Sequence, residues 1–284
     1  MTASVAGAGR QIDAGNPPQG WQASLKLRYH QAGARTLLTH QHEGPLRVQR
    51  PFFPEGGVNH TYVLHPPGGM VGDDVLHIDA SITAGAHTLI TTPGATKAYR
   101  NVCTQSQLTT NLQVDGTVEW LPQEVILFDQ SKLASSTDIS LGPQGRLISW
   151  EIVCLGRPAG GLPLLDGRAR FLTTVQDAHG HLLRDNLMLN AESEFMRAPW
   201  GLNRHTALGV MFAYPGSADL RDKVREVLHA ASFPVGVTLL NGLLVIRALA
   251  AQAQDLRRLF IRAWSCIRPL LLGCEACPPR IWNT

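Results

Sequence analysis

The stretch HTYVLHPPGGMVGDDVLHID, residues 60–79, places histidines and aspartates in one turn-rich segment. Imidazole and carboxylate groups both bind divalent cations, but these spacings match no established ligand pattern. A phosphate-binding loop is excluded, because neither Gly-Lys-Ser/Thr nor a helical pattern follows the glycines. The prolines and glycines at 66–69 favour a rigid corner, so a structural corner and a polar site in a cavity both stay open. The polar side chains concerned are His60, His65, Asp73, Asp74, His77 and Asp79.

Two further acidic residues stand out by position. Glu151 lies within the apolar run RLISWEIVCLGR, and Asp185 follows HGHLLR. A strand that is apolar on both faces is covered on both sides, so its carboxylate must be paired, hydrated in a cavity or bound to a cation. An arginine partner, Arg146 or Arg157, is the alternative to a bound cation at Glu151.

Signatures of catalysis and of tight metal binding are missing from the sequence. The pair Cys274 and Cys277 lacks the second pair or the histidines of a zinc site, and it follows a helical pattern rather than a strand. We interpret it as two ordinary thiols. There is no Gly-x-Ser-x-Gly motif and no cysteine in a catalytic context. Ordinary enzyme signatures are therefore absent, and no residue is assigned a catalytic role; a function without enzyme activity is what the family resemblance described below implies.

Size and charge limit the possible functions. The chain has 284 residues, 44% of them hydrophobic, and a net charge of +3, which describes a folded protein with a sizeable core and no nucleic-acid partner. Its longest apolar stretch is interrupted by Asn241, Gly242 and Arg247, whereas a membrane span needs roughly 20 continuous apolar residues. Five cysteines and the lack of a secretory signal pattern predict a cytoplasmic protein without a disulfide framework.

The elements that must position these residues are mostly short strands. From about 20 to 210, period-2 patterns alternate with glycines and prolines, as in the segment 22–30. The Pro93-Gly94 turn interrupts a strand pattern at 87–100, and Pro122 predicts a bend within 116–128. Because 146–157 is apolar on both faces, we expect a covered stack such as a β-sandwich or a β-solenoid.

The C-terminal third changes to helical patterns. Ser217 suits the N-cap of a helix over 218–231, and a longer helix begins near Asp255 and is expected to end at Pro269 and Gly273. Helices after a β-rich body predict a mainly β, α+β fold with a helical part at about 217–272. The apolar face of the second helix consists of Leu256, Leu259, Phe260, Ala263, Trp264 and Ile267.

Six segments resemble, in order, the signature segments of one protein family. They are GPLRVQRPFFPEG, YVLHPPGGMVGDDVL, TTPGATKAYR, EWLPQEVILF, WEIVCLGRP and PRIWNT, within a resemblance that covers Trp21 to Thr284. The chain is similar to the urease accessory protein D family, called H in some bacteria. The resemblance implies an irregular β-helix-like stack of short strands with a small C-terminal helical part. It also implies one domain over 20–284 after a flexible lead-in at 1–19.

The resemblance implies a scaffold or chaperone in urease maturation. Members of the family link apo-urease to the accessory protein F and, through it, to the nickel-carrying GTPase G, and they assist nickel insertion. Nickel is then cargo in transit, and no cofactor is tightly bound. The tail residues Arg280, Ile281 and Trp282 are the expected partner-binding residues. The apolar stripe of the helices is equally explained by packing on the β body.

Four residues match acidic or hydroxyl positions of the family's motifs: Asp74 after the glycines, Glu151 after the tryptophan, Thr96 in GATK, and Asp185. Our hypothesis is that they line the polar internal nickel route that the resemblance implies. Oxygen ligands in a wet channel hold nickel weakly, which suits transit. His60 and His65 are additional metal candidates. The alternative is a stand-alone metal-binding protein or metalloenzyme that uses Asp74 and the nearby histidines. That alternative predicts a tightly bound metal and activity without partners.

Overall fold

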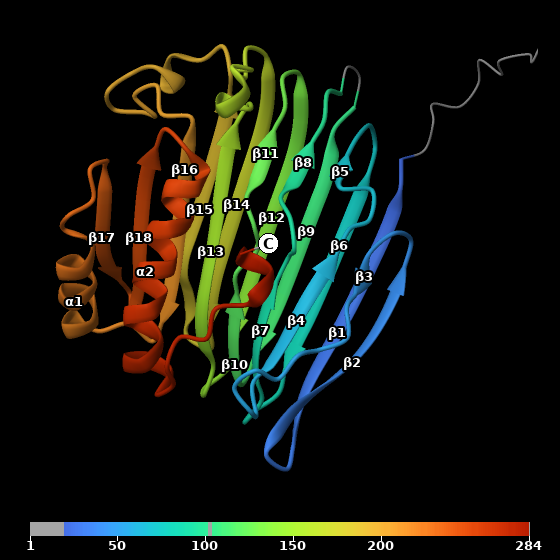
Figure 1. The fold of residues 1–284 in the computed structure, drawn as a ribbon, viewed down its shortest axis with the longest axis vertical. Helices are drawn as coiled ribbons and strands as arrows, with labels where there is room; N and C mark the ends of the chain where they lie inside the picture. The colour runs from blue at the N-terminus through green and yellow to red at the C-terminus, as the bar shows by residue number, and fades with distance from the viewer. Residues whose placement is uncertain (1–19, 102–103, 284) are drawn as a thin grey trace, which may run out of the picture.

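Two β-sheets face each other in the computed structural model, which describes residues 20–101 and 104–283 (Figure 1). The expected lead-in at 1–19 lies outside these described residues. One sheet has seven strands in the order β15-β14-β12-β9-β6-β1-β2. The other has eleven, with the path β17-β18-β16-β13-β10-β7-β4-β3 and β5, β8 and β11 beside it.

The strands have the following bounds. The seven-stranded sheet contains β1 (Gln22–Ala32), β2 (Arg35–Glu43), β6 (Val75–Ile82), β9 (Ser106–Val114), β12 (Ser131–Leu141), β14 (Gly167–Asp177) and β15 (Gly180–Asn190). The eleven-stranded sheet contains β3 (Arg47–Val48), β4 (Asn59–Leu64), β5 (Gly69–Met70), β7 (His87–Thr91), β8 (Thr96–Ala98), β10 (Thr117–Trp120), β11 (Val125–Leu127), β13 (Arg146–Leu155), β16 (Ala207–Tyr214), β17 (Val235–Leu240) and β18 (Leu243–Ala250).

The chain winds between the two sheets as a β-solenoid does. From β4 to β14 the chain passes in turn through the eleven-stranded sheet (β4–β5, β7–β8, β10–β11, β13) and the seven-stranded sheet (β6, β9, β12, β14). Equivalent strands of successive turns pair in parallel. Antiparallel strands close the stack, with β2 at one end and β15, β16, β18 and β17 at the other. The mainly β, β-helix-like fold expected from the sequence is thereby confirmed.

Two apolar cores hold the layers together. The first lies between the sheets and includes Leu27, Ile78 and Leu147. The second lies between the outer face of the eleven-stranded sheet and the helices, and includes Trp150 and Phe260. Strand β13 contributes alternate side chains to both cores, because successive side chains of a strand point to opposite faces. The predicted strand covered on both sides is therefore present.

Two helices, α1 (Ala218–Leu228) and α2 (Ala253–Leu272), cover part of the eleven-stranded sheet (Figure 1). Ser217 caps α1 as predicted, since its hydroxyl accepts a hydrogen bond from the Leu220 N–H. The six residues of the predicted apolar face of α2 are all buried. No helix among the described residues is long and apolar enough to cross a membrane.

The C-terminal third differs from the sequence prediction in two places. A β-hairpin, β17–β18, lies between the helices, because Asn241 and Gly242 both adopt positive φ and form a two-residue turn. Helix α1 ends at Leu228, before the predicted 231, whereas α2 ends at Leu272 as predicted, with Pro269 in its last turn and Gly273 at its C-cap with φ +70°. A proline in the last turn removes one backbone donor, which the buried face of this helix tolerates. Short 3-10 segments occur at Pro158–Gly160, Glu194–Met196 and Arg280–Asn283.

Candidate functional site: an internal polar route

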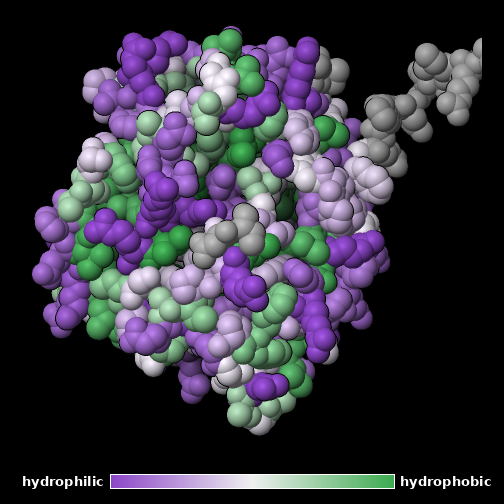
Figure 2. All heavy atoms as spheres, in the orientation of Figure 1, coloured by the Kyte–Doolittle hydropathy of each residue, from purple (hydrophilic) through white to green (hydrophobic). Residues whose placement is uncertain are grey.

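The eleven-stranded sheet is broken along one line. Strands β4, β7 and β10 each stop, and β5, β8 and β11 resume four residues later. The three breaks contain Pro66-Pro67, Pro93 and Pro122, which lack the N–H needed to continue a strand ladder. Residues of all three breaks line a cavity of about 250 Å³ between the sheets. The surface in Figure 2 is hollowed near the position of β8. The three proline-containing segments singled out in the sequence therefore form one window.

The first cavity brings together several of the predicted site residues. His65 and Thr96 line it near the window, and Glu151 lines it in the interior. Burial lowers the pKa of His65, while the negative charge of Asp74 opposes this shift. Lys97 also lines the window, and its Nζ donates to the Gly68 carbonyl at 3.4 Å.

Glu151 lies where the first cavity meets a second one of about 540 Å³, since Glu151 and Thr173 line both. Within the described part of the chain, its carboxylate has no hydrogen-bond or ion-pair partner. Among the described residues, neither arginine considered as an alternative partner contacts Glu151. Arg146 donates to the Leu271 carbonyl and Arg157 lies over the Phe128 ring at 4.5 Å.

The surroundings of the Glu151 carboxylate favour the binding of a cation to it. Burial and, to a smaller extent, the negative charge of Asp185 together raise its pKa to about 7. A buried carboxylate without a compensating cation is unfavourable when ionised, so a cation that entered the cavity would be attracted to it. Glu151 points into the space between the sheets, because it shares the inward face of β13 with Leu147 and Val153.

A row of hydroxyl groups faces Glu151 from the seven-stranded sheet. Thr110 pairs with Thr137, Thr137 with Thr173, and Thr173 with Asp185, so the four side chains form one row across four strands. Thr110, Thr137 and Thr173 line the first cavity, and Thr173 and Asp185 line the second. Sequence reasoning missed the threonines, since only the register of distant strands aligns them. The one signal in the sequence was the alternation of side chains along β9, β12 and β14, which places these threonines on the inward face of their strands.

Asp74, which was predicted to line the route, instead holds the backbone of a corner in place. It is 2% exposed, and its carboxylate accepts the backbone N–H of Trp21 at 2.7 Å and of Val71 at 2.8 Å. Gly72, with φ +55°, makes the turn before it. Among the described residues, Asp74 is not part of the lining of either cavity. Its observed contacts favour the structural reading of the opening stretch over the polar-site reading.

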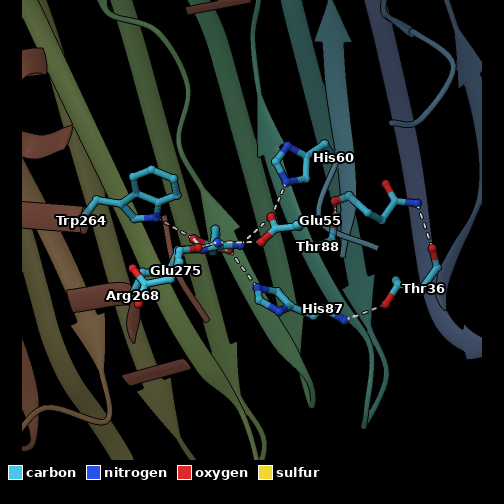
Figure 3. Close-up of polar contacts among 10 residues, drawn as sticks. Thr36, Glu55, His60, His87, Thr88, Trp264, Arg268 and Glu275 are labelled. Carbon is cyan, nitrogen blue, oxygen red and sulfur yellow. Dashed lines mark hydrogen bonds and ion pairs between the residues drawn. The ribbon is translucent and has the colours of Figure 1, made fainter. Parts of the chain in front are cut away.

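His60, the other predicted metal candidate, belongs to a separate buried network on the opposite face of the eleven-stranded sheet (Figure 3). Its Nε2 lies 2.6 Å from Glu55 Oε1. The guanidinium of Arg268, on α2, lies between Glu55 at 2.7 Å and Glu119 at 3.0 Å. His87 Nε2 contacts Glu119 at 2.8 Å. Since Arg268 and Glu119 side chains are fully buried, the network fastens α2 to β4, β7 and β10.

The C-terminal tail packs on the protein itself. Trp282 is 4% exposed and donates through Nε1 to the Thr91 hydroxyl at 3.0 Å. Of the three predicted partner-binding residues, Arg280 is exposed and Ile281 is partly buried. Cys274 and Cys277 are free thiols, and burial raises the pKa of both.

The polar groups of the interior define the chemistry. In the part of the chain that the structure describes, no three His, Cys, Asp or Glu side chains gather as a metal-binding group. Carboxylate and hydroxyl oxygens are instead spread over two adjacent cavities that share Glu151 and Thr173. Such spacing gives a cation successive single contacts rather than one closed coordination shell. The fold and the interior thus define a class: a β-solenoid protein with two adjacent cavities between its sheets.

The comparisons with known proteins identify the family. The family model described as UreD urease accessory protein matches residues 22–283. A urease accessory protein UreD of Pseudomonas putida (strain W619) is 40% identical over 268 residues, which cover 93% of this chain and 95% of that protein. Its counterparts in Aliivibrio fischeri (strain ES114) and Alkalilimnicola ehrlichii are each 39% identical, covering 93% of this chain and 97% and 92% of their own lengths. The chain belongs to the UreD family of urease accessory proteins, whose role is accessory to urease maturation rather than catalytic.

Proposed function

We propose that this protein carries nickel along its interior during urease maturation, from the window in the eleven-stranded sheet past Glu151 to Asp185. The observation that carries the proposal is the unpaired carboxylate of Glu151 at the junction of two cavities. Among the described residues, the two cavities carry a few carboxylate and hydroxyl oxygens in a mostly apolar lining and no thiol, and so few oxygen ligands favour weak and reversible binding of the ion. Nickel is cargo here, not a resident cofactor.

The same proposal includes a scaffold role. A cation that travels inside one chain needs a donor at one opening and an acceptor at the other. We propose the accessory protein F, with the GTPase G bound through it, at the donor side and apo-urease at the acceptor side. Family membership supports the urease end of this arrangement, because the matched relatives are urease accessory proteins. Of the predicted tail residues, Arg280 is exposed, and we propose it for a contact with protein F.

Glu151→Gln keeps the size of the side chain and removes its charge. In cells that express the urease structural and accessory genes, we expect urease purified with this variant to contain at least about tenfold less nickel than with the wild-type chain, a loss typical of a disturbed metal site. Nickel per urease is measured by elemental analysis, together with urease activity.

Asp138→Asn is the matched control. Asp138 is exposed on β12, so this substitution removes the same charge at a position outside the route. Cells without the chain give the baseline. If Glu151→Gln accumulates as folded protein and urease is still fully loaded with nickel, the proposed route is wrong. If urease is fully loaded without the chain, the maturation role itself is wrong.

A further inference from the structure

The second cavity ends at the open edge of the β-sandwich, where an ion pair joins the two sheets. Arg247 on β18 and Asp185 on β15 both line this cavity, and Arg247 Nη2 lies 2.9 Å from Asp185 Oδ2. Strand β15 is the last of the seven-stranded sheet, and β18 is next to the last of the eleven-stranded sheet. The pair therefore spans the opening between the two sheet edges.

Arg247 and Glu151 share one row of the eleven-stranded sheet. Glu151 pairs with Val210, and Val210 pairs with Arg247, so all three side chains point into the space between the sheets. Adjacent strands lie about 4.8 Å apart, which puts Arg247 about 10 Å from Glu151. Asp185 ends the facing row of hydroxyls. The guanidinium of Arg247 thus pairs with Asp185, the outer carboxylate of the route, whereas Glu151, the inner carboxylate, stays unpaired.

The exposure of the pair makes it easy to open. The side chains of Arg247 and Asp185 are 50% and 32% exposed. Ion pairs exposed to this degree contribute little to folding stability, because water screens them. Among the described residues, the guanidinium of Arg247 has Asp185 as its hydrogen-bond and ion-pair partner, so nothing else holds the side chain inward.

We propose that Arg247 is a tethered cation that keeps the outlet of the route closed. A divalent cation reaches Asp185 only when the guanidinium swings outward, since two cations cannot share one carboxylate without strong repulsion. Arg247 is a positioning residue in this proposal: it acts through Asp185 and controls when the outlet accepts or releases the metal. The inference rests on the proposed function, and it goes beyond it by assigning a gate.

The test is a calorimetric titration of the purified full-length chain with nickel chloride. Arg247→Gln removes the tethered charge, and Arg247→Lys retains it. We expect Arg247→Gln to bind nickel at least about tenfold more tightly than the wild-type chain, which corresponds to about 1.4 kcal/mol. Arg247→Lys restores weak binding, and adding Asp185→Asn to Arg247→Gln removes the gain. A purely structural role for Arg247 predicts neither the gain nor the rescue by lysine.

Arg221→Gln is the matched control, because Arg221 is paired with Asp222 at 2.8 Å on α1 and does not line either cavity. We expect it to bind nickel like the wild-type chain. The gate is overturned if Arg247→Gln and the wild-type chain bind nickel equally, or if the gain persists with Asp185→Asn. The two hypotheses can fail separately. If the Arg247 variants bind nickel as predicted but urease is loaded normally with Glu151→Gln, the gate is supported and the route past Glu151 is wrong.

Discussion

Thr173→Trp should reduce the nickel content of urease to the level of cells that lack the chain. Thr173 faces the junction of the two cavities, and an indole there fills the space that a cation must cross. The inner face is roomy at this point, so we expect a modest stability cost of about 1–3 kcal/mol, as for other overpacked sites. The measurement is nickel per purified urease, with the variant's melting temperature alongside it.

The neighbouring threonine supplies the control for this substitution. Thr174 lies on the outward face of β14, next in sequence and opposite in direction. Thr174→Trp adds the same volume outside the route, and we expect normal nickel loading. Equal loading of urease with both tryptophan variants would mean that nickel does not pass between the sheets at this level.

Arg268→Met should destabilise the folded protein by about 3–5 kcal/mol, because it leaves the buried carboxylate of Glu119 and the partly buried carboxylate of Glu55 without their cation. For a domain of this size, that loss lowers the melting temperature by about 10 °C. Arg258→Met, on the same helix, is the control. Its guanidinium is 68% exposed and 3.8 Å from Asp255, so its loss should have little effect. A melting temperature for Arg268→Met within about 2 °C of the control would contradict a fastening role.

The same network makes stability depend on acid. Burial raises the pKa of Glu55, but hydrogen bonds from His60 and Arg268 outweigh burial and lower it from 4.5 to about 2. A carboxylate with a lowered pKa stabilises the fold above its ordinary value, and the contribution disappears as the pH falls from 4.5 to 2. The stability advantage of the wild-type chain over Glu55→Gln, measured by denaturant unfolding, should therefore be full at pH 7 and shrink across that window.

The sequence predicted local features of the fold better than its long-range pairing. The alternation of 22–30 and the apolar stripe of α2 were sufficient to place β1 and the helix, since both patterns are periodic. The Asn241-Gly242 turn was visible in the sequence and would have predicted the hairpin that interrupts the helical part. Pro269 lies in the last turn of α2 and Gly273 caps the helix, so these two residues marked its end correctly.

The candidate site was predictable only in part. Glu151 could be inferred from an acid within an apolar strand, and Thr96 and Asp185 from the family resemblance. The row of Thr110, Thr137 and Thr173 depends on the register between turns of the solenoid, which no local pattern encodes. The same holds for Arg247, whose partner lies 62 residues away in the other sheet. Long-range register is the physical reason that the interior had to be seen in the structure.

The most direct measurement of the internal route is anomalous X-ray diffraction at the nickel absorption edge, from crystals of the chain soaked in nickel chloride. We predict an anomalous peak between the sheets within coordination distance of the Glu151 carboxylate, about 2 Å. The peak should be absent in Glu151→Gln crystals treated in the same way. Nickel found only on surface histidines such as His40 and His42, with an empty interior, would contradict the route.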